Sequence, residues 1–231
     1  MDLIISSISK SFQLILALDP YLVEVSLLSL FLSLSSAVAS FAIGVPLGFM
    51  LSEGEFPGKK MVIAVVNTGM GLPPVIVGLI VSLLFGRAGI FGALNILYSC
   101  KAIFISQLII AFPMACGLTI AACGEIPVQL KMQLKSFGAG RLQCIYYLSR
   151  EIRKTLPAIF LAAFGSVVSE VGAVIMVGGN ILGETRVLTT AIVSEVRMGN
   201  YEIALAFSFV LLAVTFMVNY IVGSITGKKR V

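Results

Sequence analysis

Five long uncharged or nearly uncharged runs divide the chain. They cover residues 25–52, 61–86, 102–124, 156–178 and 203–227. Each exceeds the ~20 residues that cross a bilayer as an α-helix, and only the fourth contains a charged residue, Glu170. The pattern therefore predicts an all-α integral membrane protein with five transmembrane helices.

The N-terminal segment is apolar but follows a different pattern. Lys10 and the pair Asp19-Pro20 interrupt residues 3–18 and leave only short apolar runs. This favours an amphipathic helix in the membrane interface over a further span. We therefore divide the chain into an N-terminal interfacial helix, residues 1–20, and a transmembrane domain, residues 21–231. Ala37-Val38-Ala39 resembles a signal-peptide cleavage site, but the apolar run continues past it to Leu51, so we expect no cleavage.

Residues 125–155 form a long polar connection with helical periodicity. Its apolar positions are Leu130, Leu134, Phe137, Leu142, Ile145, Leu148 and Ile152. Gly138-Ala139-Gly140 separates the two halves, which predicts two helices with a glycine break. The apolar side either enters a groove of a partner protein or packs on the bundle of this chain.

Composition supports the membrane assignment. Hydrophobic residues make up 58% of the chain and charged residues 12%, about half the usual charged fraction of soluble domains. The mean hydropathy is +1.07. A water-soluble enzyme is excluded, because a soluble fold of this size could not bury so much apolar surface.

Catalytic, metal and nucleotide sites find little support. The chain has no histidine, which removes Ser-His pairs and HExxH zinc sites. Its four cysteines show no CxxC spacing and are interpreted as small core residues. Two glycine–lysine stretches, 54–60 and 223–229, lack the Ser or Thr of a P-loop. We expect no metal, no cofactor and no nucleotide site.

The distribution of basic residues predicts the orientation. The loops 52–60 and 124–156 and the C-terminal end hold eleven of the 16 basic residues: Lys59, Lys60, Lys131, Lys135, Arg141, Arg150, Arg153, Lys154, Lys228, Lys229 and Arg230. Positive residues favour the cytoplasmic side. The N-terminus is therefore expected outside and the C-terminus in the cytoplasm, and the basic excess indicates topology, not nucleic-acid binding.

The segment 125–155 resembles the coupling loop of ABC importer permeases, which docks on a cytoplasmic ATPase. Gly138, Ala139 and Arg141 fit the family pattern, whereas Met132-Gln133-Leu134 replaces its Glu-Ala-Ala. The resemblance implies that Leu134, Gly138, Ala139 and Arg141 form the ATPase-coupling loop.

Other motifs resemble the tungstate-type permeases of that family. They are residues 67–75 (NTGMGLPPV), 170–173 (EVGA), 177–181 (VGGNI), 185–192 (TRVLTTAI), Glu195 and 199–206 (GNYEIALA). Molybdate and sulfate permeases are the alternative, although they usually carry Thr-Gln-Thr-Leu-Pro where this chain has Thr185-Arg186-Val187-Leu188-Thr189-Thr190. A secondary transporter is a more distant alternative.

The resemblance implies a type I ABC importer permease, in a prokaryotic inner membrane, that is not itself an enzyme. Its expected partners are a second copy, a cytoplasmic ATPase, an extracytoplasmic tungstate-binding protein and the lipid bilayer.

A translocation pathway for an oxyanion needs neutral hydrogen-bond donors and no excess of negative charge. The candidate pathway residues are Asn180, Thr185, Arg186, Thr189, Thr190 and Pro73. The alternative is an ordinary polar outer loop that begins at Gly178-Gly179. Pro73-Pro74 either unwinds a pore-lining stretch or only kinks the second span. For the intramembrane acid, Glu170, structural pairing is favoured over a role as a gate element.

Overall fold

The computed structural model describes residues 2–227, except for the side chains of 2–6, 131, 135, 141, 142 and 225–227. Over that range the chain is helical, without a β-strand. The elements are α1 (Asp2–Leu16), α2 (Pro20–Glu53), α3 (Lys59–Met70), α4 (Pro74–Phe85), η1 (Gly92–Leu94), α5 (Cys100–Gly124), α6 (Val128–Ser136), α7 (Arg141–Ile152), α8 (Leu156–Val168), α9 (Gly172–Gly178), α10 (Leu188–Met198) and α11 (Tyr201–Gly227).

The five apolar runs correspond to three long helices and two bent pairs. Helices α2, α5 and α11 are each long and apolar enough to cross a membrane. The second run consists of α3 and α4, with a bend of 102° between them. The fourth run consists of α8 and α9, with a bend of 59°. The prediction of five spans therefore holds only if each bent pair counts as one span, and the interruption expected at Pro73-Pro74 is present as the break between α3 and α4.

Each bend has a local cause. Helix α3 ends at Met70 with Gly71 as its C-cap, and α4 begins at Pro74 after Pro73, because proline cannot continue the hydrogen bonding of the preceding helix. Helix α8 ends at Val168 with Ser169 as its C-cap, and α9 begins after Glu170 and Val171. The Glu170 carboxylate accepts a hydrogen bond from the Ala173 N–H at 2.9 Å and so caps the start of α9.

Helices α2 and α5 pack closely at the centre of the molecule, where small residues allow the backbones to approach. A Cβ atom placed on Gly48 would lie 2.4 Å from the Cys116 carbonyl oxygen, and one on Gly44 would lie 2.8 Å from the Ala115 Cβ. The buried Ser36 hydroxyl lies 3.0 Å from the Gln107 Oε1 in the same interface. The small residues thus pack helix against helix, as is common in membranes.

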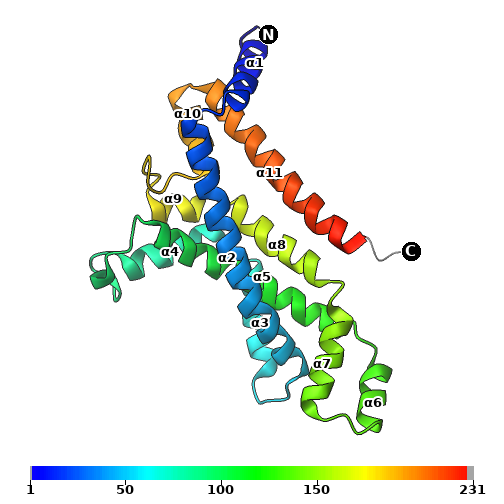
Figure 1. Cartoon of the computed structure of the whole chain (residues 1–231). Coiled ribbons are helices and arrows are strands. Elements are labelled where there is room, and N and C mark those ends of the chain that lie inside the picture. Colours follow the sequence, from blue (N-terminus) through cyan, green and yellow to red (C-terminus); the bar gives the residue numbers. More distant parts are fainter. Residues whose placement is uncertain (1, 228–231) are drawn as a thin grey trace.

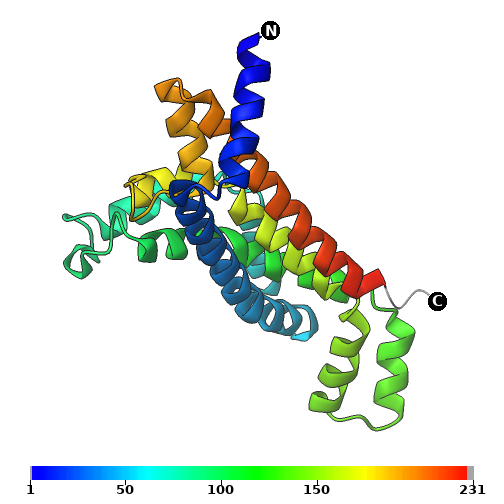
Figure 2. The same ribbon diagram turned by 45° about the horizontal axis from the view of Figure 1, so that its top comes forward.

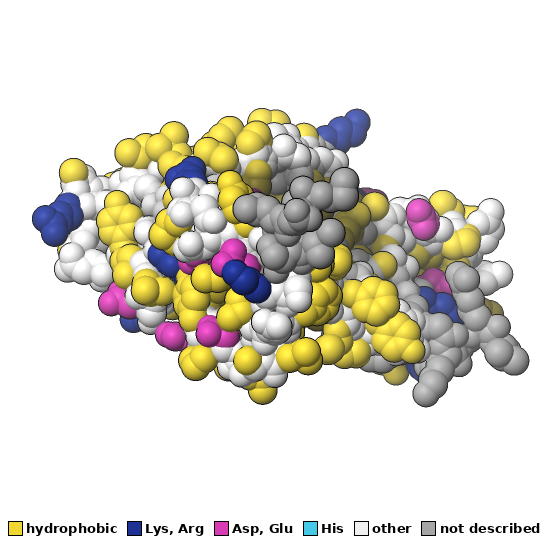
Figure 3. Space-filling model, turned by 90° about the horizontal axis from the view of Figure 1, so that it is seen from above, with side chains coloured by type: hydrophobic (Ala, Val, Ile, Leu, Met, Phe, Trp, Pro, Cys, Tyr) yellow, Lys and Arg dark blue, Asp and Glu magenta, His cyan; other side chains and the backbone are white. Residues whose placement is uncertain are grey.

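Two parts of the chain extend from opposite ends of this bundle (Figure 1). Helix α1 lies at one end with α10 and packs on α11, where the Phe12 and Phe209 rings stack at 5.2 Å. Helices α6 and α7 form a hairpin at the other end, and Figure 2 shows that its tip stands clear of the remaining helices. Seen from the α1 end, hydrophobic side chains dominate the surface and charged ones are scattered among them (Figure 3). Large exposed hydrophobic side chains along α2 and α11, among them Leu27, Phe31, Leu212 and Phe216, suit a lipid environment.

Candidate functional site

The α6–α7 hairpin contains the predicted coupling residues. Gly138 has a φ of +73°, a left-handed conformation that strongly favours glycine, and it ends the connection from α6. The Ala139 N–H donates to the Leu134 carbonyl at 3.1 Å, which closes the C-terminal turn of α6. The Gly140 N–H donates to the Gln143 Oε1 at 2.9 Å and thereby stabilises the start of α7. The predicted helix–glycine–helix arrangement is present.

The two faces of the hairpin differ. Leu148 and Ile152 are 3% and 4% exposed and join the core of the bundle, against which Leu134 is also packed. Phe137, at the tip, is 86% exposed. The apolar residues of the hairpin therefore divide into two groups. Leu134, Leu148 and Ile152 pack on the bundle of this chain, and Phe137 is exposed. The Arg141 side chain lies outside the described residues, as do those of Lys131 and Lys135.

Phe137 differs in exposure from the apolar positions around it. It occupies an apolar position of the helical pattern and directly precedes Gly138, but periodicity alone gave no means to distinguish it from Leu134. The structure distinguishes the two residues, because Leu134 packs on the core and Phe137 is exposed.

Of the predicted pathway residues, Pro73 and Thr189 lie at the two helix breaks. The others lie in the loop after α9 or at the start of α10. The breaks at 71–73 and 169–171 are neighbours, since α4 packs on α9 and a Cβ atom on Gly172 would lie 2.7 Å from the Val75 Cγ2. Pro73 forms the N-terminal boundary of α4 in this region. The loop from Gly179 to Val187 then leads from α9 to α10. Helix α10 was not expected from the sequence.

The three threonines form hydrogen bonds with the backbone. The Thr185 hydroxyl donates to the Gly178 carbonyl at 2.6 Å and accepts from the Ile181 N–H at 2.9 Å. The Thr189 hydroxyl donates to the Glu170 carbonyl at 2.8 Å. The Thr190 hydroxyl accepts from the Val187 N–H at 3.0 Å and caps α10. All three side chains are buried, so they hold the break and the following loop in place.

Arg186 belongs to a polar cluster. Its Nη1 donates to the Tyr21 hydroxyl at 2.7 Å and lies 3.7 Å from the Glu195 Oε1. Tyr21 in turn donates to Glu195 at 2.9 Å, and the Asn200 amide donates to the other Glu195 oxygen at 2.9 Å. We call these four residues the Arg186 cluster. It joins the start of α2 to the α9–α10 loop and to the α10–α11 turn.

Two polar atoms near this loop remain unsatisfied within the described part of the chain. The Asn180 Oδ1 and the Arg186 Nε are buried and have no hydrogen-bond partner there. Asn180 also adopts a φ of +52°, a conformation that asparagine tolerates better than most residues. The Glu170 carboxylate, by contrast, has the backbone partner described above, which is the structural pairing that its sequence position favours.

No metal-binding group of three or more His, Cys, Asp or Glu residues occurs among the described residues. Together, the long apolar helices, the bent helix pairs and the protruding hairpin define a class: a multi-pass, all-helical membrane protein with a helical hairpin at one end.

Comparisons with known proteins specify the family. The chain is 34% identical over 225 residues to the tungstate uptake system permease protein TupB of Peptoclostridium acidaminophilum, with 97% of this chain and 99% of that protein aligned. It is 37% identical to a probable anion ABC transporter permease protein of Haloferax volcanii, over 86% of this chain and 88% of that protein. The molybdenum transport system permease protein ModB of Escherichia coli K12 is 28% identical over 74% of this chain and 78% of ModB.

The fold agrees with this similarity. A chain of the MetNI methionine ABC transporter, solved in inward-facing conformations, matches with a TM-score of 0.73 at 20% identity and covers 91% of this chain and 96% of its own length. No family model matches the chain. The chain belongs to the family of ABC transporter permease subunits that includes the tungstate uptake permeases.

Membership of this family confirms the resemblance found in the sequence. It makes the chain a transport component and not an enzyme, with ATP hydrolysis in a separate subunit. It also places the chain in a prokaryotic inner membrane as a multi-pass protein. The alternative of a secondary transporter is thereby set aside.

Proposed function

We propose that this chain is the permease subunit of an ATP-driven importer for tungstate. The observation that carries the proposal is the 34% identity to a tungstate uptake permease along 97% of this chain. The motifs 67–75, 170–181 and 185–192 support it, since they resemble the tungstate type more than the molybdate and sulfate types. Molybdate and sulfate are the alternative substrates.

The proposed assembly contains two copies of this chain. Each copy carries one α6–α7 hairpin and no nucleotide-binding motif, so a homodimer would present two docking elements to two copies of a cytoplasmic ATPase. An extracytoplasmic tungstate-binding protein would deliver the anion. Eleven of the 16 basic residues fall in loops 52–60 and 124–156 and at the C-terminal end of the sequence, which supports an outside N-terminus and a cytoplasmic C-terminus.

The hairpin is proposed as the coupling element. Phe137 offers an exposed apolar side chain at its tip, and the adjoining Gly138 gives the sharp turn that presents it. An apolar anchor on a short helix suits insertion into a groove of the ATPase. Leu148 and Ile152 would transmit movement, because they attach the hairpin to the core formed by α2, α5 and α8.

The pathway is proposed to pass the two neighbouring breaks. Non-helical backbone at membrane depth is tolerated only inside protein or beside water, and both conditions are met where two copies enclose a channel. Thr185, Thr189 and Thr190 would shape this path by fixing the breaks, since their hydroxyls bind backbone groups. Asn180 would contribute the N–H donors of its side-chain amide. The path carries little net charge near Arg186, because Glu195 pairs with it.

The test is ATP-dependent uptake into vesicles that contain the permease, its ATPase and its binding protein. Tungstate is supplied as the transported anion, and molybdate and sulfate compete in separate series. We expect uptake to require ATP. We also expect excess tungstate to inhibit it more strongly than molybdate or sulfate does. Stronger competition by molybdate or sulfate would assign the importer to that anion, and uptake without ATP would contradict the ABC mechanism.

A further inference from the structure

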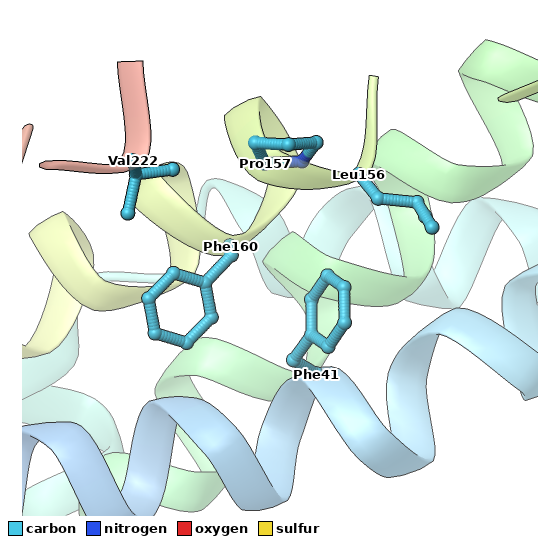
Figure 4. Close-up of a pocket in the computed structure, with 5 residues that line it drawn as sticks. All are labelled: Phe41, Leu156, Pro157, Phe160 and Val222. Carbon is cyan, nitrogen blue, oxygen red and sulfur yellow. The ribbon is translucent and has the colours of Figure 1, made fainter. Parts of the chain in front are cut away.

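An apolar groove lies between α2, α8 and α11 at the end of the molecule that carries the α6–α7 hairpin. Figure 4 shows its five lining residues, which are Phe41, Leu156, Pro157, Phe160 and Val222. Its volume is about 230 Å³, below the roughly 300–1,000 Å³ of ordinary small-molecule sites. The size and the apolar lining suit a stretch of hydrocarbon chain better than a whole polar ligand.

The floor of the groove is rigid. The Phe41 and Phe160 rings meet edge to face with centroids 5.8 Å apart, and Phe160 stacks on the buried Phe164 at 6.5 Å. These contacts hold α2 against α8. Helix α11 forms the opposite wall, and only 11% of its most apolar stretch is buried. The groove therefore opens toward the membrane and not into the protein core.

Two cations directly precede the groove-lining residues Leu156 and Pro157 in the chain. Arg153 and Lys154 are exposed and lie in the short link that leads from α7 into Leu156 and Pro157. Arg150 and Glu151, in the last turn of α7, are also exposed and together add no net charge. The link thus presents a net charge of two positive units beside an apolar groove.

We infer that this groove binds one acyl chain of an anionic phospholipid, whose phosphate lies against Arg153 and Lys154. Basic pockets between transmembrane helices at the cytoplasmic side recognise anionic headgroups through this combination of charge and apolar contact. The site lies where the coupling hairpin joins the bundle, so the bound lipid stabilises the junction between α7 and α8. The inference goes beyond the proposed function, because it concerns the lipid and not the transported anion.

Native mass spectrometry of the intact permease–ATPase complex tests the inference. The complex is equilibrated with equal amounts of phosphatidylglycerol and phosphatidylethanolamine, and the lipids retained on each permease copy are counted. Wild-type protein is expected to retain phosphatidylglycerol in preference. Each cation contributes roughly fivefold to this preference, so Arg153→Gln with Lys154→Gln is expected to abolish most of it.

Two further variants separate charge from groove. Val222→Phe, which fills the groove, is expected to reduce retention of both lipids. Lys59→Gln with Lys60→Gln makes the same change of charge at the start of α3, away from the groove, and is expected to keep the wild-type preference. Equal retention of the two lipids by wild-type protein, or an unchanged preference in the Arg153/Lys154 variant, would overturn the inference. Disulfide formation between two copies carrying Val222→Cys would also overturn it, because a second copy would then cover the groove.

Discussion

Neutralising the Arg186 cluster provides a test of whether Arg186 acts on the transported anion or on the protein. The perturbation is a double-mutant cycle of Arg186→Gln and Glu195→Gln. Both side chains are largely buried, at 14% and 4% exposure, and their charged atoms lie 3.7 Å apart. At an effective dielectric constant of about 20, two unit charges at that distance attract by roughly 4 kcal/mol before the cost of desolvation.

The expected losses follow from what each variant leaves behind. Arg186→Gln leaves the buried Glu195 charge with only the Tyr21 and Asn200 donors, and loss of one partner of a buried ion pair costs about 3 kcal/mol. Glu195→Gln leaves Arg186 bonded to Tyr21 and closer to water, at a cost of about 1–2 kcal/mol. Because the double variant contains no unpaired charge, it is expected to cost less than the sum, with a coupling energy of about 1.5–3 kcal/mol.

The assay has two readouts. Unfolding in mixed detergent–dodecyl sulfate micelles gives the coupling energy, and uptake in vesicles gives the transport rate per inserted copy. The double variant is expected to transport at close to the wild-type rate, since it restores a neutral pair. Additive losses, with a coupling energy below about 0.5 kcal/mol, would refute the ion-pair argument. Normal stability with uptake reduced more than tenfold would instead assign Arg186 to the anion. Arg186→Glu is a harsher change than sequence alone suggests, because it places two carboxylates together.

Three other predictions concern the hairpin, the central interface and the topology. Gly138→Val places a β-branched residue at φ +73° and is expected to reduce co-purification of the ATPase and uptake while insertion remains normal; unchanged co-purification would contradict the coupling role. Gly48→Ala is expected to lower the free energy of unfolding by about 1–3 kcal/mol, because its Cβ would lie 2.4 Å from a carbonyl oxygen, whereas the control Gly124→Ala, with nothing within 4 Å, should be neutral; equal effects would argue against close α2–α5 packing. Leu182 and Phe137 are both exposed, at 61% and 86%, so only the side of the membrane decides whether a cysteine there meets an impermeant reagent. In a background without native cysteines, a cysteine at Leu182 should react from outside, and one at Phe137, on the predicted cytoplasmic hairpin, should not. The reverse result would invert the orientation.

Much of the fold could be predicted from local pattern. The five apolar runs coincide with the long helices and bent pairs, and Pro73-Pro74 marks the sharper bend. Gly138 marks the break of the hairpin. Helix α10 was not predicted, because Thr185 to Thr190 is polar and resembles a loop. Its burial against α2 and α11 overrides that local preference.

The candidate site was only partly predictable. Motif similarity selected the candidate pathway residues, and the structure adds their contacts. The sequence does not show whether a threonine hydroxyl is free to bind an anion or is bonded to the backbone. In the structure the Thr189 hydroxyl donates to the Glu170 carbonyl, which joins residues from two different helical segments.

Membrane character, family, and the breaks at Pro73-Pro74 and Gly138 follow from the sequence alone, because hydropathy and the special geometry of proline and glycine act over a few residues. Which polar groups satisfy one another depends on the tertiary structure. Tyr21 and Arg186 are separated by 165 positions and Tyr21 and Glu195 by 174. No periodicity reports such a pairing, since burial in an apolar medium selects partners by proximity in space.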